Sequence, residues 1–212
     1  MSPRIRLAPP PRERRSHAER TAETRAKVMA AVVEAIAEVG FQRTTAAEIT
    51  RRAGVSWGAV QHHFGGKDGI LVAVLEDSFN QLADRLAAED PGRLALAERV
   101  SVFVDRAWEH FGSSRYRSTF EILLNYPDAG TGGGEAWRSM LSAWNEVWDR
   151  LFPAPHLSRR AVVTLQLYAI SVLSGLATAR MLGDPTARLL DGPLALLKQT
   201  LVRELGVHPG CG

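Results

Sequence analysis

The chain has 212 residues, 45% of them hydrophobic and 23% charged, which is typical of a soluble globular protein with one large or two small domains. No apolar run reaches the roughly 20 residues of a membrane span, and a proline triplet stands where a signal peptide would have its apolar core, so we expect a cytoplasmic protein. Residues 1–67 hold 12 Lys and Arg against 6 Asp and Glu, whereas residues 68–212 hold 14 against 17. This asymmetry indicates an anionic partner for the N-terminal part only.

Residues 1–15 contain five arginines and four prolines, and we expect them to be disordered in isolation. They are either a solvated tail or an arm that follows phosphates or enters a minor groove. A membrane surface is the weaker candidate for the anionic partner, because no basic amphipathic helix with bulky apolar residues is visible.

The first helix is predicted to begin at a capping box of Ser16 and Glu19, or one turn later at Thr21. Apolar residues then recur at steps of three and four and make one stripe, which ends at Gly40. Phe41 is predicted to fill the core between this helix and the next motif.

Residues 44–67 have the pattern of two short helices joined by a tight turn. Thr45 and Glu48 form a second capping box, Gly54 can take the left-handed conformation of a helix end, and Ser56 can cap the following helix. This is the helix-turn-helix pattern, although an αα-corner inside a bundle has similar spacing. Three features favour a DNA-binding helix-turn-helix: the basic neighbourhood, the hydrogen-bonding outer face and the lysine at position 67.

The same stretch resembles a known family in the following residues: Gly40-Phe41, Thr44-Thr45, Ile49, Ala53-Gly54-Val55-Ser56, Gly58, His63-Phe64, Lys67 and Leu71. They resemble the N-terminal DNA-binding domain of the TetR family of transcriptional repressors over about residues 20–72. The predicted organisation is the disordered basic arm (1–15), a DNA-binding domain (16–67) and, as the resemblance implies, a helical ligand-binding and dimerisation domain (68–208).

By this resemblance, the residues that contact DNA are Thr45, Ser56, Trp57, Gly58, Ala59, Gln61, His62, His63 and Lys67. Thr45, His63 and Lys67 would contact phosphates, and His62 would lie near the backbone. Gln61 stands where the family most often has tyrosine, and a glutamine can pair with an adenine edge for about 1–3 kcal/mol of discrimination. Trp57 can contact a thymine methyl group or fold back onto the first helix.

The sequence after residue 67 predicts six more helices, at about 68–88, 96–111, 114–125, 135–152, 158–182 and 192–206. The chain is therefore expected to be all-α, with about nine helices. Between two of them, residues 125–134 are predicted to form a mobile surface loop, because they hold a proline and three consecutive glycines.

Four of the five tryptophans lie between residues 108 and 148. Each can be an ordinary core residue, but clustered indole N–H groups fill a small bundle awkwardly and favour a cavity for an apolar or aromatic ligand. The predicted walls are Trp108, Phe111, Tyr116, Phe120, Trp137, Met140, Trp144, Trp148 and Tyr168. No nucleophile, paired-carboxylate or metal-ligand motif is visible, so we expect no enzyme, metal or cofactor.

The last two helices carry more apolar surface than one core needs. Leucines at 190, 194, 197, 201 and 205 repeat as a packing seam, and Ser171, Gly175 and Ala179 form a strip of small residues. This favours a homodimer through the last two helices over a thick intramolecular core. The expected function is a homodimeric repressor, released from a palindromic operator by an apolar effector. The alternative is a DNA-binding regulator without an inducer that a protein partner controls.

Overall fold

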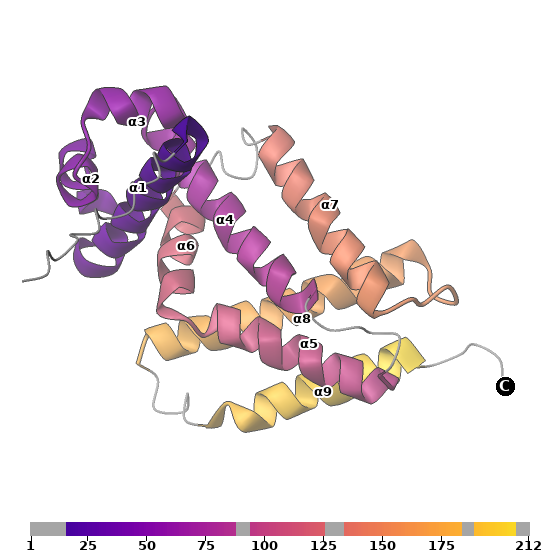
Figure 1. Ribbon diagram of the computed structural model, residues 1–212. Coiled ribbons are helices and arrows are strands. Elements are labelled where there is room, and N and C mark those ends of the chain that lie inside the picture. Colours follow the sequence, from indigo (N-terminus) through magenta and orange to yellow (C-terminus); the bar gives the residue numbers. More distant parts are fainter. Residues whose placement is uncertain (1–15, 88–93, 126–133, 184–188, 207–212) are drawn as a thin grey trace, which may run out of the picture.

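The computed structural model describes residues 16–87, 94–125, 134–183 and 189–206, and these residues are almost entirely helical (Figure 1). The predicted arm at 1–15 and residues 126–133 of the loop predicted at 125–134 lie outside the described residues, while Asn125 ends α6 and Gly134 begins α7. Within them the elements are α1 (His17–Val39), η1 (Phe41–Arg43), α2 (Ala46–Ala53), α3 (Trp57–Phe64), α4 (Lys67–Ala87), α5 (Leu96–Phe111), α6 (Ser114–Asn125), α7 (Gly134–Leu151), α8 (Arg159–Met181) and α9 (Asp191–Gly206). The predicted all-α fold is confirmed.

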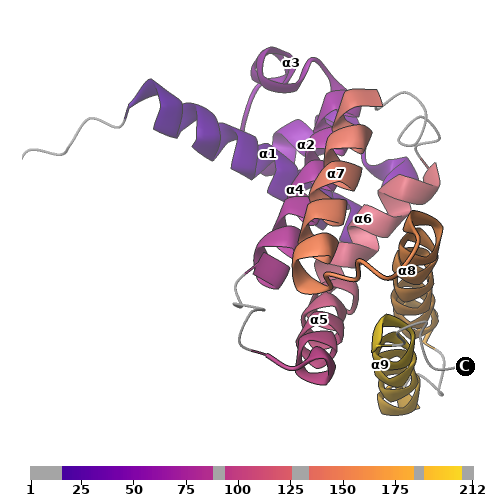
Figure 2. The same ribbon diagram turned by 90° about the vertical axis from the view of Figure 1, so that its right-hand side faces the viewer.

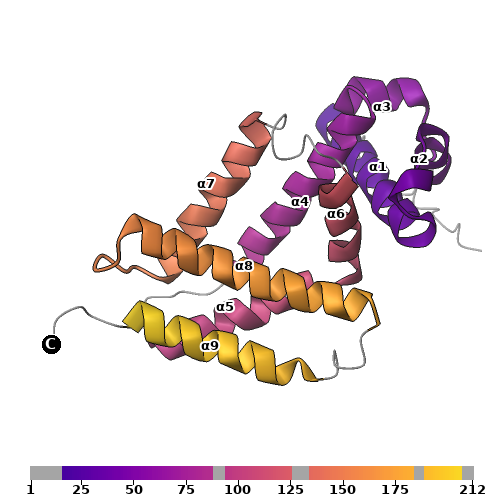
Figure 3. The ribbon, with the colours of Figure 1, turned by 180° about the vertical axis from the view of Figure 1, so that it is seen from behind.

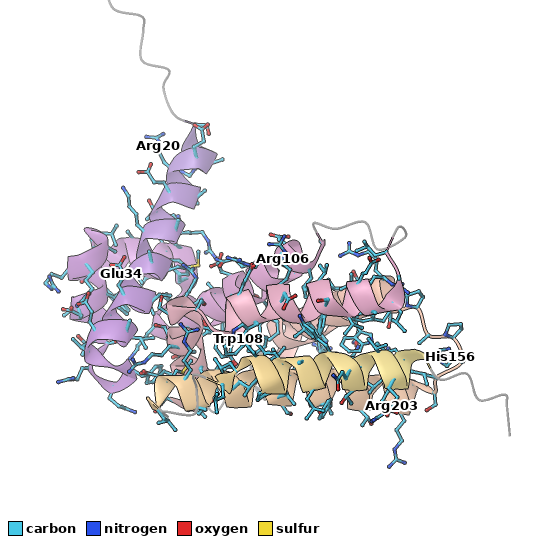
Figure 4. The ribbon with its side chains drawn as sticks, turned by 90° about the horizontal axis from the view of Figure 1, so that it is seen from below. Arg20, Glu34, Arg106, Trp108, His156 and Arg203 are labelled. Carbon is cyan, nitrogen blue, oxygen red and sulfur yellow. The ribbon has the colours of Figure 1, made fainter. Side chains whose placement is uncertain are left out.

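Helix α1 begins at the earlier of its two predicted starts. The Ser16 hydroxyl accepts from the Glu19 backbone N–H (3.1 Å), and the Glu19 carboxylate accepts from the Ser16 N–H (2.7 Å). The first turns of α1 project from the body of the molecule, with Arg20 near the exposed end (Figures 2 and 4). From Val28 onward the apolar stripe of α1 is buried against Ile49 of α2 and Val60 of α3, which forms a first hydrophobic core.

Two helices, α4 and α6, are shared between this first core and a second one. The first half of α4 buries Ile70 and Leu75 in the first core, whereas Leu82 lies in the second. In α6, Ile122 is completely buried in the first core and Tyr116 belongs to the second. The two ends of each helix therefore contribute to different cores.

Hydrogen bonds tie α6 to α1 and to the turn that follows it. The Ser118 hydroxyl donates to the Val33 carbonyl of α1 (2.9 Å). The Phe41 backbone N–H donates to a Glu121 carboxylate oxygen (3.1 Å). Ser118 is itself fully buried, so its loss of hydration is offset by this bond. Helix α6 is thus held to the N-terminal unit by polar contacts as well as by packing.

The second core lies between α4, α5, α7, α8 and α9. In α9 the predicted leucine seam packs inward against α5 of the same chain, and Leu197 and Leu201 are almost completely buried. The leucine seam thus belongs to the core of one chain, and the dimer through the last two helices stays a prediction. Helix α9 lies beside α5 (Figure 4) and shields the apolar stripe of α5 from solvent along its length.

Helices α8 and α9 form one outer side of the molecule (Figure 3). The outward face of α8 is apolar: the side chain of Leu167 is 59% exposed and that of Leu182 is 81% exposed. Ser171 and Gly175 are exposed on the same stripe, since they follow Leu167 at helical spacing. By length and composition alone, α8 could also cross a membrane, and 28% of its most apolar window is buried.

We predict that Ile122→Ala destabilises the protein by on the order of 2–5 kcal/mol, because it opens a cavity in the first core. Leu124→Ala is the matched control on the same helix: its side chain is 67% exposed, and the change should stay within about 0.5 kcal/mol. Urea denaturation gives both free energies of unfolding. Equal effects of the two substitutions would show that α6 is not part of the first core.

Candidate nucleic-acid interface and effector region

The turn between α2 and α3 is built by the residues that the sequence predicted. The Thr45 hydroxyl accepts from the Glu48 N–H at the start of α2 (3.3 Å), and the Ser56 hydroxyl accepts from the Ala59 N–H at the start of α3 (3.2 Å). Gly54 between the two helices has φ 66°, in the left-handed region that favours glycine. The local capping pattern therefore sets the angle at which α3 is presented.

The predicted capping box at Thr45 is only half made, because the Glu48 carboxylate is engaged elsewhere. It accepts from Arg51 (2.7 Å) and Arg52 one helical turn later, and these hydrogen bonds hold the pKa of Glu48 at about 2. Arg52 also donates to Glu38 of α1 (2.7 Å), which lowers the pKa of Glu38. This ion network fixes α2 against α1.

The outward face of α3 is small and polar. Gly58, Gln61 and His62 are exposed, while Ala59 and His63 are half-buried. Thr45 and Ser56 are exposed at the starts of α2 and α3. These positions leave the backbone and the Gln61 amide accessible for close approach of a ligand.

Trp57 does not belong to this outward face. It stands three residues before Val60 and seven before Phe64, so it shares their side of the helix and packs against the first core. Trp57 is half-buried in this position, and its contact with a base stays a prediction.

The C-terminal end of α3 is held by a residue that the sequence analysis did not single out. Arg25 of α1 donates through Nη1 to the His63 carbonyl (2.6 Å), and its guanidinium lies 4.4 Å from the centre of the Phe64 ring. A cation at this end of the helix is favoured by the helix dipole and by the aromatic face. Arg25 is separated from His63 by 38 positions, so no local pattern indicates the contact.

The corner between α3 and α4 depends on glycine. Gly65 has φ 74° and Gly66 has φ 144°, and a Cβ atom at Gly69 would lie 1.8 Å from the Phe64 carbonyl oxygen. Lys67, the last predicted DNA contact, begins α4, and its ammonium lies 5.2 Å from the centre of the Phe41 ring. The end of α3 is therefore pressed directly onto the first turn of α4.

A buried polar cluster lies where α4, α5 and α6 meet. Ser78 Oγ is 3.3 Å from His110 Nε2, and the Thr119 hydroxyl donates to Ser78 Oγ (3.2 Å). Burial lowers the pKa of His110 to about 4, with smaller effects from the charges of Arg85 and Arg115. His110 is therefore neutral at pH 7. The sequence showed these residues only as scattered polar positions on three apolar helices.

Three predicted ligand-contacting residues border this cluster. Phe111 and Tyr116 have ring centres 4.7 Å apart, Tyr116 and Phe120 lie 6.1 Å apart, and the Tyr116 ring is 5.7 Å from that of His110. Tyr116 also reaches α8, where its hydroxyl is 3.2 Å from that of Ser174. Burial raises the pKa of Tyr116, so its hydroxyl keeps its proton at neutral pH.

Trp144 and Trp148 form a second aromatic group with Phe103, whose ring centre is 5.3 Å from that of Trp148. Trp108 of α5 is half-buried and packs against the same core. The side chains of Trp137 and Met140 lie outside the described residues.

Tyr168 does not join either group. It is on the exposed outer stripe of α8, because the inward side of that helix is taken by residues such as Leu165 and Ala169. The prediction that Tyr168 contacts a core ligand therefore does not agree with its position.

The comparisons with known proteins agree with this geometry. Residues 28–74 match the profile of the bacterial regulatory proteins of the tetR family. The N-terminal unit of this chain is therefore a DNA-binding domain of the TetR-family type. The chain is 44% identical over 64 residues to the HTH-type transcriptional regulator BetI 2 of Chromohalobacter salexigens, covering 30% of this chain and 31% of that protein. It is 41% identical over 85 residues to BetI of Escherichia coli, covering 38% and 43%.

These matches span less than half of each BetI protein, so they characterise only the N-terminal unit of this chain. The overall fold is similar to the FadR transcriptional regulator of Bacillus subtilis, solved in complex with stearoyl-CoA. The TM-score is 0.63 at 17% identity, and the match covers 88% of this chain and 99% of FadR. The relatives are transcriptional regulators and not enzymes, in agreement with the expectation from sequence.

We predict that Gly69→Ala destabilises the protein by on the order of 1–3 kcal/mol, since the Phe64 carbonyl must move to admit a Cβ atom. Gly58→Ala is the control: its nearest neighbour would be Ser56 Oγ at 3.8 Å, an ordinary contact. That change should be neutral or stabilise the helix by up to about 1 kcal/mol. Urea denaturation gives the free energy of unfolding of both variants. A Gly69→Ala protein as stable as the unsubstituted protein would contradict the close contact.

Proposed function

We propose that this protein is a cytoplasmic DNA-binding transcriptional regulator that acts as a homodimer. In this proposal it is a repressor, released from a palindromic operator by an apolar or aromatic small molecule. The observation that carries the proposal is the exposed face of α3, which is small and polar and is held at both ends, by the Ser56 cap and by Arg25. A helix presented in this way fits a major groove.

The contacts to DNA divide into two kinds. Gln61 and His62 are exposed on α3, and the Gln61 amide can donate to and accept from one adenine edge. Thr45, His63 and Lys67 lie at helix ends around this face and would contact phosphates, which position the protein but carry little sequence information. Lys67 would leave the face of the Phe41 ring to reach a phosphate.

The apolar outer face of α8 supports dimerisation. Leu167 on α8 and Leu182 just beyond its C-terminal end are more than half exposed, and no atom lies within 4 Å of a Cβ position at Gly175. A second copy related by a two-fold axis would cover this face, and the small residues would allow close approach of its helices. Two recognition helices would then lie about 34–36 Å apart, or a multiple of this, on a palindrome.

Three buried donors favour a small-molecule effector over control by a protein partner alone. The ring N–H groups of Trp144 and Trp148 and the side-chain NH₂ of Gln166 are buried in the second core, and they have no hydrogen-bond partner in the described part of the chain. Such groups are costly unless an acceptor meets them. A mostly apolar molecule with an acceptor oxygen would satisfy this requirement.

Helix α6 offers a route from such an effector to DNA. Its Tyr116 and Thr119 side chains contact the second core, while Ser118 and Ile122 contact the N-terminal unit. A shift of α6 would therefore change the positions of α1 and α3. A coupling of about 1–3 kcal/mol between effector and operator is enough for useful regulation.

We predict that Gln61→Ala and Lys67→Ala have different effects on DNA binding. Without Gln61, binding-site selection from a random DNA library should give a less specific consensus at one position in each half-site, because the adenine contact is lost. Without Lys67, all sites should weaken about equally, and the slope of log affinity against log salt should fall by about 1.

The two variants control for each other, since both lie at the same end of the N-terminal unit. An unchanged consensus for Gln61→Ala would contradict its assignment as a base contact. A loss of affinity confined to particular sequences would contradict the phosphate role of Lys67.

We predict that Gly175→Glu yields folded monomers, because the new carboxylate meets open space within one protomer but like charge across a two-fold interface. Ala97→Glu, at an exposed position on α5, should leave the dimer intact. Analytical ultracentrifugation measures the mass, and circular dichroism confirms the helical fold. A dimeric Gly175→Glu protein would place the interface elsewhere.

A further inference from the structure

A pocket lies at the end of the molecule farthest from α1–α3. Its volume is about 520 Å³, and three segments form its walls. These are the start of α5, the end of α9, and the stretch from Phe152 to His156 between α7 and α8. His156 is seen beside the C-terminal end of α9 (Figure 4), while the helix-turn-helix unit lies at the other end (Figure 1).

Arg99 is the charged group of this pocket. Its Nη1 donates to the Leu151 carbonyl (3.1 Å), and its Nε is buried without a hydrogen-bond partner. Within the described residues Arg99 makes no ion pair with a carboxylate. Other arginines of the same bundle do, for example Arg115 with Asp77 at 2.6 Å. A half-buried guanidinium without a counter-ion is unfavourable, so an anion would be bound strongly here.

The carboxylates near this pocket are already engaged. Glu98 accepts from the Ala95 backbone N–H (2.9 Å) at the start of α5. Glu204 on α9 is paired with Arg203 (2.9 Å), which points away from the body of the molecule (Figure 4). The described part of the chain therefore leaves the Arg99 guanidinium available to an anionic ligand.

The remaining walls are mostly apolar. Leu96, Phe152 and Leu205 line the pocket, together with Pro153 and Pro155, whose rings keep the linker stiff. A guanidinium beside an apolar cavity matches a molecule with one carboxylate and an apolar body, because the carboxylate can accept two parallel N–H bonds. The volume is in the range of small-molecule sites, which is about 300–1,000 Å³.

We infer that this pocket is a binding site for a small apolar monocarboxylate, and that Arg99 binds the carboxylate. The site is separate from the His110 region, and the inference does not depend on the proposed regulatory function. Its occupancy can be observed directly, since the Phe152 ring in its wall lies 4.9 Å from the Trp148 ring. A ligand against Phe152 should therefore change the fluorescence of Trp148.

The test uses the full-length protein and decanoate below its micelle-forming concentration, followed by calorimetry and tryptophan fluorescence. Decanol is the matched probe without the charge, and inorganic phosphate is the anion without the apolar body. We expect saturable binding of decanoate, with a Kd below about 1 mM, and at least about tenfold weaker binding of decanol. Phosphate should not bind measurably.

Two variants assign the binding to this pocket. Arg99→Met keeps the length of the side chain and removes the charge, and it should weaken decanoate binding at least about tenfold while leaving decanol binding unchanged. Ala154→Phe fills the pocket without altering Arg99, and it should weaken both probes. If Arg99→Met unfolds by circular dichroism, Ala154→Phe alone decides. Decanoate binding that is absent, equal to that of decanol, or unaffected in the folded variants would overturn the inference.

Discussion

Helix α6 is buried at both of its ends, in two different hydrophobic cores. Its Ile122 side chain fills the first core and its Tyr116 ring fills the second, only six residues away. The Ser118 hydroxyl adds a buried hydrogen bond to α1. Because packed cores respond to displacement in discrete steps rather than continuously, α6 cannot shift at one end without a response at the other.

This constraint gives a physical meaning to the arrangement of α3. The recognition helix has few buried contacts of its own, and its end is pressed against α4 at Gly69 and bonded to α1 through Arg25. The two helices that hold α3 in this way, α4 and α1, both contact α6. The position of the polar face of α3 is thus determined by the packing of the whole chain, which is the property that a ligand-controlled DNA reader needs.

The sequence predicted the helix-turn-helix well because its determinants are local. Caps such as Ser56 and a left-handed glycine such as Gly54 act over three or four residues, and periodicity locates each helix. The sequence alone could not show whether each apolar helix face is packed inside the chain or exposed. The leucine seam of α9 and the outer stripe of α8 are both apolar, and only the fold shows that Leu201 is internal and Leu167 exposed.

The contacts that sequence reasoning missed are those between distant positions. Arg25 meets a backbone carbonyl 38 positions away, and Arg99 meets one 52 positions away. Neither acceptor has a side-chain signature, because any residue supplies a carbonyl. The Ser78–His110–Thr119 cluster likewise joins three helices whose polar positions look unremarkable one at a time. The local sequence pattern predicts where each helix begins and ends. The contacts between distant positions depend on how the helices pack together.

The most direct test of the coupling is amide hydrogen exchange of the protein with and without its selected operator DNA. We expect DNA, which would touch only the N-terminal unit, to slow exchange in α6 as well as in α3, since α6 shares the first core. Slower exchange in α3 with no change across residues 114–125 would contradict this coupling. It would show that α3 moves independently of α6.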